Sequence, residues 1–196
     1  MSKNRCVLPE GRVSYPALFE PKDNFNKTSK EFSVQISWPK TQDLTDFRKA
    51  LLEAMREKYG SDQATKWPVQ FRKRDMMQYL SETGQDGWPL RDGDVSGRPE
   101  LDGCVYATFR SPADRRPKVV DHNVQPILDP SEIYGGGYAR VSVNAYASDK
   151  CGSGKGGVSA SLGNVQKTKD GEAFGAGNVR PEDDFGPVDN NDEEEF

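Results

Sequence analysis

The sequence predicts a mainly β fold, a small and partly open barrel of five strands with one α-helix after the second strand. Three observations predict it. Several segments alternate apolar and polar residues with a period of two, as half-buried strands do. A single segment, residues 42–59, has convincing helical spacing. Only 34% of the residues are hydrophobic, and 19 glycines and 13 prolines in 196 residues favour short strands and many turns.

The first two strands are expected at residues 12–19 and 31–38. Pro16 lies inside the first segment and implies an edge strand or a bulge there, because proline has no amide hydrogen to donate. The second segment alternates cleanly. Its apolar face consists of Phe32, Val34, Ile36 and Trp38.

The helix is expected at residues 42–59. Its apolar residues recur at intervals of three and four, which places Leu44, Phe47, Leu51, Met55 and Tyr59 on one face. We interpret this stripe as a face packed on the core. Thr41 is the expected N-cap and Gly60 the expected C-terminal stop.

Residues 61–102 form a long irregular insertion between the helix and the third strand. A segment of this length without regular structure is usually functional or disordered. Its aromatic residues argue against full disorder. These residues are Trp67, Phe71, Tyr79 and Trp88.

The last three strands are expected at residues 103–110, 138–147 and 158–166, with a glycine-rich hairpin loop at 148–157. From Gly175 onward the composition is that of a disordered tail. Five strands with one helix after the second fit the OB-fold, a small barrel that commonly binds oligonucleotides or oligosaccharides. Other small barrels would give a similar periodicity.

Charge is unevenly distributed along the chain. The formal net charge is −4, and residues 182–196 hold eight acids and no lysine or arginine, so the rest of the chain carries +4. A basic body with an acidic tail is typical of proteins that bind polyanions. Uneven charge is also found in many soluble proteins, so this observation alone does not decide between the two.

Aromatic and basic residues are interleaved at 66–74, at 106–118 and on one face of 138–146. Proteins that bind single strands need cations that neutralise phosphates and flat rings that stack on bases. The predicted cationic contacts are Arg72, Lys73, Arg74, Arg110, Arg115, Arg116, Lys118 and Arg140, with Lys150 and Lys155 on the hairpin loop. The predicted stacking residues are Trp67, Phe71, Tyr106, Phe109 and Tyr146. Any one of these rings could instead be a core residue, because aromatics in strands usually are.

Other chemistries find little support. The glycine-rich stretch at 151–157 does not match a phosphate-binding loop, because Gly156 stands after Lys155 where serine or threonine is needed. Three widely spaced cysteines and one histidine suggest neither disulfides nor a metal site, so we expect no cofactor and no catalysis. No apolar run is long enough for a signal peptide or a membrane span, and we expect a cytoplasmic protein.

Several long segments resemble a family of small bacteriophage single-stranded DNA-binding proteins with an OB-fold. They are RPKVVDHNVQPILDPSEIYGGGYARVSVNAYASD at 116–149, GVSASLGNVQKTKDGEAFG at 157–175, GRVSYPALFEP at 11–21 and WPLRDGDV at 88–95. The resemblance covers most of residues 11–185. It implies a role in phage DNA replication or recombination in the cytoplasm of an infected bacterium.

The acidic C-terminus is the second functional signal. We expect residues 1–175 to form the nucleic-acid-binding domain and 176–196 the disordered tail. The tail could compete with DNA for the basic body, and a terminal aromatic carboxylate could dock on a partner protein. The expected partner-binding residues are Asp192, Glu193, Glu194, Glu195 and Phe196. The resemblance implies recruitment of replication proteins such as a polymerase or helicase, and self-association on DNA is a further expectation.

The leading hypothesis is therefore sequence-independent binding of single-stranded DNA. Two alternatives stay open. One is a metal-dependent DNA-processing enzyme, for which carboxylates are plentiful although their spacing shows no convergence. The other is a protein-interaction module whose acidic tail imitates DNA.

Overall fold

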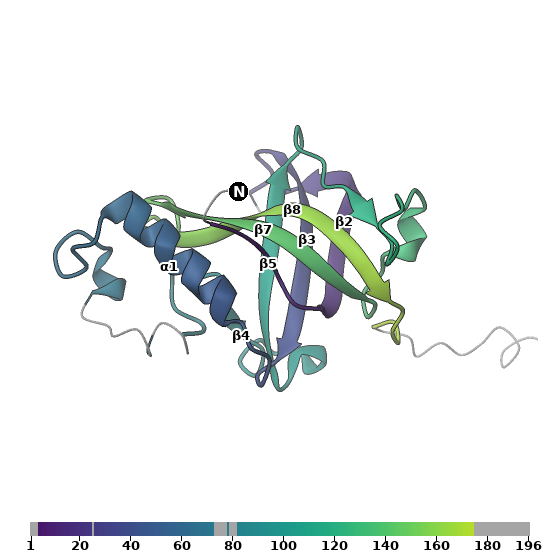
Figure 1. Cartoon of the computed structure of the whole chain (residues 1–196), viewed down its shortest axis with the longest axis horizontal. Helices are drawn as coiled ribbons and strands as arrows, with labels where there is room; N and C mark the ends of the chain where they lie inside the picture. Colours follow the sequence, from purple (N-terminus) through teal and green to yellow (C-terminus); the bar gives the residue numbers. More distant parts are fainter. Residues whose placement is uncertain (1–3, 25, 73–77, 79–81, 175–196) are drawn as a thin grey trace, which may run out of the picture.

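The structure, a computed structural model, describes residues 4–24, 26–72, 78 and 82–174. It contains five long strands, and its helix α1 (Thr45–Tyr59) follows the second of them (Figure 1). The long strands are β2 (Gly11–Asp23), β3 (Lys30–Pro39), β5 (Cys104–Pro112), β7 (Tyr138–Ser148) and β8 (Gly157–Lys169). The prediction of a mainly β fold with one helix in this position is confirmed.

The five long strands form a closed ring. β2 pairs with β3 and β3 with β5, both antiparallel; β5 pairs with β8 in parallel; β8 pairs with β7, and β7 returns to β2, both antiparallel. This is the strand order of an OB-fold. Three short strands extend the ring: β1 (Arg5–Val7) beside β7, β4 (Arg91–Asp92) beside β5, and β6 (Val119–Val120) beside β8.

The first long strand contains the irregularity that Pro16 predicted. The register between β2 and β3 shifts between Ser14 and Ala17, so Tyr15 and Pro16 form a bulge. Tyr15 has a φ of 47°, and its side chain is 64% exposed. The bulge therefore turns a large aromatic ring outward from the ring of strands.

Helix α1 buries the apolar stripe that its sequence predicts, with Phe47, Leu51 and Met55 almost fully inside. Gly60 ends the helix with a φ of 79°. The predicted N-cap at Thr41 is wrong. The helix begins at Thr45, so its N-cap residue is Leu44, which makes no side-chain cap hydrogen bond. The Thr45 amide donates instead to the Asp43 carboxylate at 2.8 Å. The helix packs on β7 and β8 (Figure 1).

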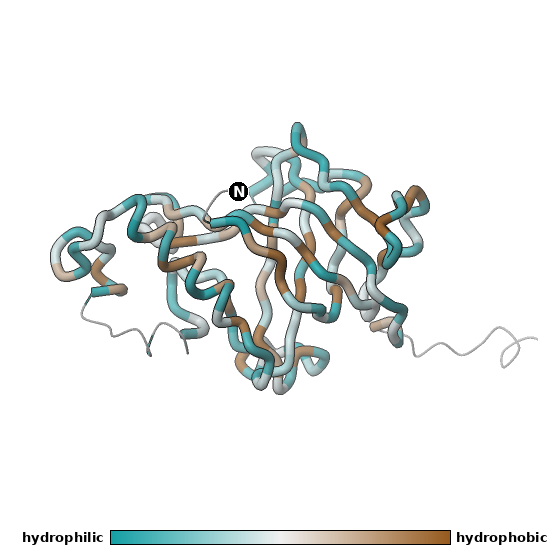
Figure 2. Tube along the Cα trace, in the orientation of Figure 1, coloured by the Kyte–Doolittle hydropathy of each residue, from teal (hydrophilic) through white to brown (hydrophobic). Residues whose placement is uncertain are grey.

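The hydrophobic core fills the space between the ring and the helix. Phe109 makes edge-on ring contacts with Trp38 and Phe47, with centroids 6.4 and 5.9 Å apart. Hydropathy alternates along the strands and along α1 in the way that this packing requires (Figure 2). Among the described residues, no helix is long and apolar enough to span a membrane.

The described residues of the insertion at 61–102 include regular structure that its irregular sequence does not suggest. Among them are the 3₁₀ turns η1 (Val69–Phe71) and η2 (Pro99–Leu101) and strand β4. Phe71 and Trp88 are buried against each other, with ring centroids 6.1 Å apart. The insertion therefore extends the core, while its residues 73–77 and 79–81 lie outside the described part.

The last described residues are held against the body. The Phe174 amide donates to the Gly135 carbonyl at 2.9 Å, and the Arg12 guanidinium lies 4.1 Å from the Phe174 ring centroid. Gly136 has a φ of 109°, and a Cβ there would lie 2.0 Å from the Glu172 carbonyl oxygen. Only glycine permits this close approach. The predicted tail, residues 176–196, lies outside the described residues.

Replacing Phe109 with alanine tests this core. Truncating a fully buried aromatic leaves a cavity, so Phe109→Ala should lower the free energy of unfolding by about 3–5 kcal/mol. Tyr146→Ala removes an exposed ring and should lower it by about 1 kcal/mol or less. Urea unfolding monitored by circular dichroism would measure both. Equal losses in the two variants would contradict the assignment of Phe109 to the core.

Candidate nucleic-acid interface

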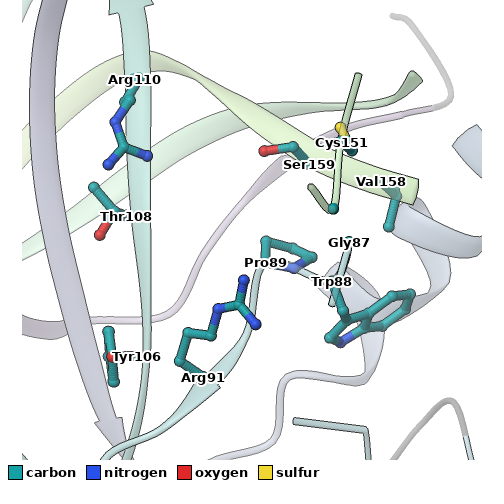
Figure 3. Close-up of a pocket in the computed structure, with 11 residues that line it drawn as sticks. Gly87, Trp88, Pro89, Arg91, Tyr106, Thr108, Arg110, Cys151, Val158 and Ser159 are labelled. Atoms are coloured by element: carbon teal, nitrogen blue, oxygen red, sulfur yellow. The ribbon is translucent and has the colours of Figure 1, made fainter. Parts of the chain in front are cut away.

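Two hollows lie side by side on the outer face of the ring and share Arg110. The first has a volume of about 350 Å³ and the second about 520 Å³. The first is lined by Gly87, Trp88, Pro89, Arg91, Tyr106, Thr108, Arg110, Cys151, Gly152, Val158 and Ser159 (Figure 3). The second is lined by Ser29, Lys30, Glu31, Arg110, Ser111, Pro112, Arg115, Asn144, Tyr146 and Ser161. We call the two together the Arg110 groove.

Strand β5 positions the floor of this groove. Side chains alternate along the strand, so Val105, Ala107 and Phe109 are buried while Tyr106, Thr108 and Arg110 face outward. The next two strands continue the outer surface. Arg110 lies opposite Ser161 of β8, and Ser161 lies opposite Asn144 of β7. Three strands therefore bring small polar side chains into one row beside the Arg110 guanidinium.

Four cationic side chains line the groove. Arg91 and Arg110 extend into the first hollow from β4 and β5 (Figure 3), and Lys30 and Arg115 line the second. Among the described residues that line the two hollows, Glu31 is the only acid, and its carboxylate accepts from Arg110 Nε at 2.8 Å. The Arg110 side chain is still 55% exposed. An incoming phosphate could therefore reach the guanidinium by replacing one surface ion pair.

Tyrosine rings lie along the same outer surface. Tyr146 is 44% exposed in the second hollow, and Tyr106 is half-buried in the first. The Arg98 guanidinium carbon lies 4.9 Å from the Tyr106 ring centroid and 5.7 Å from that of Tyr15. Flat rings within reach of cations are the combination that single-strand binding requires.

An ion-pair cluster fixes the segment that carries Arg91. Lys40 Nζ lies 2.7 Å from Asp92 Oδ1 and 2.5 Å from Asp94 Oδ2. The hydrogen bonds to the two carboxylates raise the pKa of Lys40, and the bond from Lys40 lowers the pKa of Asp94. Lys40 and Asp94 are therefore both charged near neutral pH, and the ion pairs of Lys40 tie the start of this segment to the end of β3.

The structure brings together part of the predicted site. Tyr106, Arg110, Arg115 and Tyr146 all line the Arg110 groove. They come from β5, from the turn that follows it and from β7. Their roles in binding stay predictions.

Three of the predicted stacking residues are corrected by the structure. Trp67 is 3% exposed, and Phe71 and Phe109 are fully buried. These rings pack in the core, so they cannot stack on bases in this conformation. Trp67 also donates from Nε1 to the Gly60 carbonyl at 2.8 Å.

Of the predicted cations in the insertion, only Arg72 lies among the described residues, and it does not line the groove. The half-buried Arg72 donates from Nε to the Trp67 carbonyl at 2.7 Å and helps to hold the insertion in place. Lys73 and Arg74 lie outside the described residues, as do Asp192, Glu193, Glu194, Glu195 and Phe196 of the tail.

The other predicted cations are exposed but lie beyond the two hollows. Lys150 and Lys155 stand on the hairpin loop whose Cys151 and Gly152 line the first hollow. Arg116 lies 5.9 Å from the Phe19 ring centroid, and Lys118 leads into β6.

Arg140 faces outward on β7 as its alternation predicts, and it lies opposite Gln166. The pKa of Glu10 is lowered chiefly by the side chains of Lys169 and Thr168, and to a smaller extent by the charge of Arg140. Ser142, which alternation places beside Arg140, is buried. Its Oγ accepts from the Asn164 amide at 2.8 Å.

Sequence reasoning missed Lys30, Arg91, Arg98 and Tyr15. Tyr15 and Arg91 lie within the recurrent segments at 11–21 and 88–95, which could have drawn attention to them. Lys30 stands at the first position of β3, and no pattern distinguishes it from other exposed lysines. Arg98 reaches the surface only through the path of the insertion, which periodicity does not reveal.

Metal chemistry has no visible site in the described part of the chain. Within it, no group of three histidine, cysteine, aspartate or glutamate side chains is arranged to hold a metal ion. The Cys151 thiol in the first hollow has its pKa raised, chiefly by burial. It is therefore a poor nucleophile at neutral pH.

Comparison with known proteins places these features in context. The chain is 30% identical, over 198 residues, to protein p50 of Acyrthosiphon pisum secondary endosymbiont phage 1, and the alignment covers 98% of each chain. Its fold is similar to that of the single-stranded DNA-binding protein from bacteriophage Enc34 in complex with ssDNA, with a TM-score of 0.63, 21% identity and coverage of 89% and 91% of the two chains. It is also similar to gp2.5, a single-stranded DNA-binding protein encoded by bacteriophage T7, with a TM-score of 0.59, 13% identity and coverage of 92% and 99%.

The family comparison covers nearly the whole chain. The family described as the ssDNA-binding protein of Enterobacter phage Enc34 matches residues 4–196. The match includes every element of the ring, the helix and the insertion. The chain therefore belongs to the Enc34 family of phage single-stranded DNA-binding proteins.

Proposed function

We propose that this protein binds single-stranded DNA without sequence preference, through the Arg110 groove. The observation that carries the proposal is the groove itself: four cations, a single acid and two accessible tyrosine rings along the outer face of an OB-fold. Cations that contact phosphates do not read sequence, and every base has a face that can stack. Membership in a family described as ssDNA-binding supports the same function.

The groove is suited to a flexible single strand. Small side chains such as Thr108, Ser159 and Ser161 form its floor, so bases could approach the tyrosines without steric hindrance. Glu31 holds the Arg110 guanidinium in place before DNA arrives. An arginine held in this way loses little conformational freedom when it exchanges a carboxylate for a phosphate.

We further propose that the protein acts without catalysis, in the cytoplasm of an infected bacterium, in support of phage DNA replication and recombination. The acidic residues at 182–196 would compete with DNA for the groove and would recruit replication proteins such as a polymerase or helicase. Self-association on DNA is part of this proposal. Family membership and the charge asymmetry of the chain support it.

Removing the shared arginine tests the groove. Arg110→Ala should weaken binding to fluorescein-labelled oligo-dT about tenfold, because a charged hydrogen bond to phosphate is lost. It should also reduce the steepness of the salt dependence by about 0.7 in the log–log slope, the value for one phosphate contact on a single strand. Fluorescence anisotropy at several salt concentrations measures both quantities.

The matched control is Arg56→Ala, which removes the same charge from an exposed position on α1 outside the groove. It should change neither affinity nor slope appreciably. If the two variants behave alike, the groove is not the binding site. A wild-type protein whose affinity for oligo-dT does not respond to salt would contradict the proposed function as a whole.

The tail makes a separate prediction. Deleting residues 182–196 should tighten binding to oligo-dT, since a competing polyanion with eight acidic side chains is removed. The gain should shrink as salt rises, because screening weakens the competition. The same anisotropy titration measures it. Unchanged or weaker affinity after the deletion would rule out the competing role of the tail.

The absence of catalysis is tested by incubation of the full chain with end-labelled single strands and Mg²⁺ or Mn²⁺. We expect the strands to remain intact on a denaturing gel over hours. Metal-dependent cleavage that co-purifies with the protein through ion exchange and gel filtration would establish a DNA-processing enzyme instead.

A further inference from the structure

Residues 93–101 form a lid over the outer face of β2, β3 and β5, next to the first hollow. Both ends of the lid are anchored. Leu101 is fully buried, and Gly93 approaches it so closely that a Cβ would lie 2.0 Å from the Leu101 carbonyl oxygen. Lys40 holds Asp94 by an ion pair. In contrast, Val95 within the lid is 82% exposed, so the middle of the lid projects into solvent between its two anchored ends.

The lid places Arg98 against two tyrosines. Its guanidinium carbon lies 4.9 Å from the Tyr106 ring centroid and 5.7 Å from that of Tyr15. Arg98 Nη1 donates to Gln35 Oε1 at 3.2 Å. Among the described ion pairs Arg98 has no partner. Its guanidinium is held by uncharged groups, namely the rings and hydroxyls of Tyr15 and Tyr106 and the Gln35 amide oxygen. A planar guanidinium on a tyrosine face occupies the space that a stacked base would take.

The surface beneath Arg98 is polar and incompletely paired. Gln35 is 5% exposed and Ser14 is 2% exposed, and they lie opposite each other on the same face of the β2–β3 pair. Gln35 Nε2 and Ser14 Oγ are buried and have no hydrogen-bond partner. Buried polar groups usually find partners, and leaving them without one costs free energy. These two groups are therefore available to a polar ligand that enters between the rings.

The backbone conformation of Tyr15 also favours a functional role for this surface. Its φ of 47° lies in the left-handed region, which is unfavourable for a bulky residue. The bulge between Ser14 and Ala17 imposes this conformation and directs the ring outward. Strained conformations of this kind tend to cluster at functional sites.

We propose that Tyr15, Tyr106 and Gln35 form a subsite for one unpaired nucleobase, and that Arg98 fills this subsite until DNA binds. A base displaces the guanidinium, stacks on the tyrosines and hydrogen-bonds to the Gln35 amide. Arg98 is then a removable plug and makes no contact with phosphate. The inference rests on the proposed function, because it assigns a base to a surface that adjoins the Arg110 groove.

The test compares Arg98→Ala and Tyr15→Asn with the wild type. Asparagine suits position 15 because it tolerates positive φ and lacks a ring. Binding is measured by anisotropy on labelled oligo-dT and on an abasic strand of equal length, each at several salt concentrations. Thermal unfolding followed by circular dichroism confirms that each variant retains a cooperative transition.

We expect Arg98→Ala to bind oligo-dT several-fold more tightly than the wild type, with an unchanged salt slope, because the plug is gone and no phosphate contact is lost. Tyr15→Asn should bind oligo-dT about tenfold more weakly, in line with the loss of one stacking ring. In the double variant the gain from Arg98→Ala should disappear. On the abasic strand all variants should match the wild type, since no base is present to occupy the subsite.

Two results would overturn the plug. The first is weaker binding by Arg98→Ala with a slope reduced by about 0.7, which would make Arg98 a phosphate contact. The second is an unchanged affinity of Tyr15→Asn for oligo-dT. In either case a wild type that binds oligo-dT through Arg110 leaves the proposed function standing. A wild type that does not bind oligo-dT overturns both the function and the subsite.

Discussion

The closed ring of five strands is the constraint on which the rest of the structure depends. Because the ring has an inside and an outside, successive side chains of a strand point alternately into the core and toward the outer surface. Phe109 packs between Trp38 and Phe47, and this packing forces its neighbour Arg110 onto the outer surface. The hydrophobic core thus determines where the charge of the binding face lies. The same rule carries through the paired strands, which is how Ser161 and Asn144 come to lie beside Arg110.

In the free protein, Arg110 already forms an ion pair with a carboxylate, which in our proposal a DNA phosphate replaces. Arg110 is held by Glu31 in a solvent-accessible pair, and exposed pairs of this kind contribute little to stability. Replacing the carboxylate by a phosphate therefore costs little. Arg98 of the lid is also held by weak contacts, namely those with the rings of Tyr15 and Tyr106 and with the Gln35 amide, while the ends of the lid are anchored. In both places, our proposal is that a nucleic acid replaces a group that occupies the position in the free protein.

Strand and helix periodicity was enough to predict the approximate positions of the five long strands and of α1 along the chain. The same periodicity could have prevented one wrong prediction, that Phe109 stacks on bases. Alternation in GCVYATFR places Phe109 on the opposite face from Tyr106 and Arg110, so the two rings could never have shared one role. Trp67 and Phe71 were harder to assign, because nothing periodic in the insertion distinguishes a core ring from an exposed one. Arg98 and Tyr15 meet only through a lid and a bulge, and such contacts between distant segments leave no local pattern in a sequence.

Our proposal places single-stranded DNA across β5, β8 and β7 on the outer face of the ring. Photo-cross-linking of the full chain to oligo-dT, followed by peptide mapping, tests it most directly. We expect cross-links at Tyr106 on β5 and Tyr146 on β7, and we expect unlabelled competitor strand to suppress them. Cross-links confined to α1, on the side of Lys49 and Arg56, would contradict it.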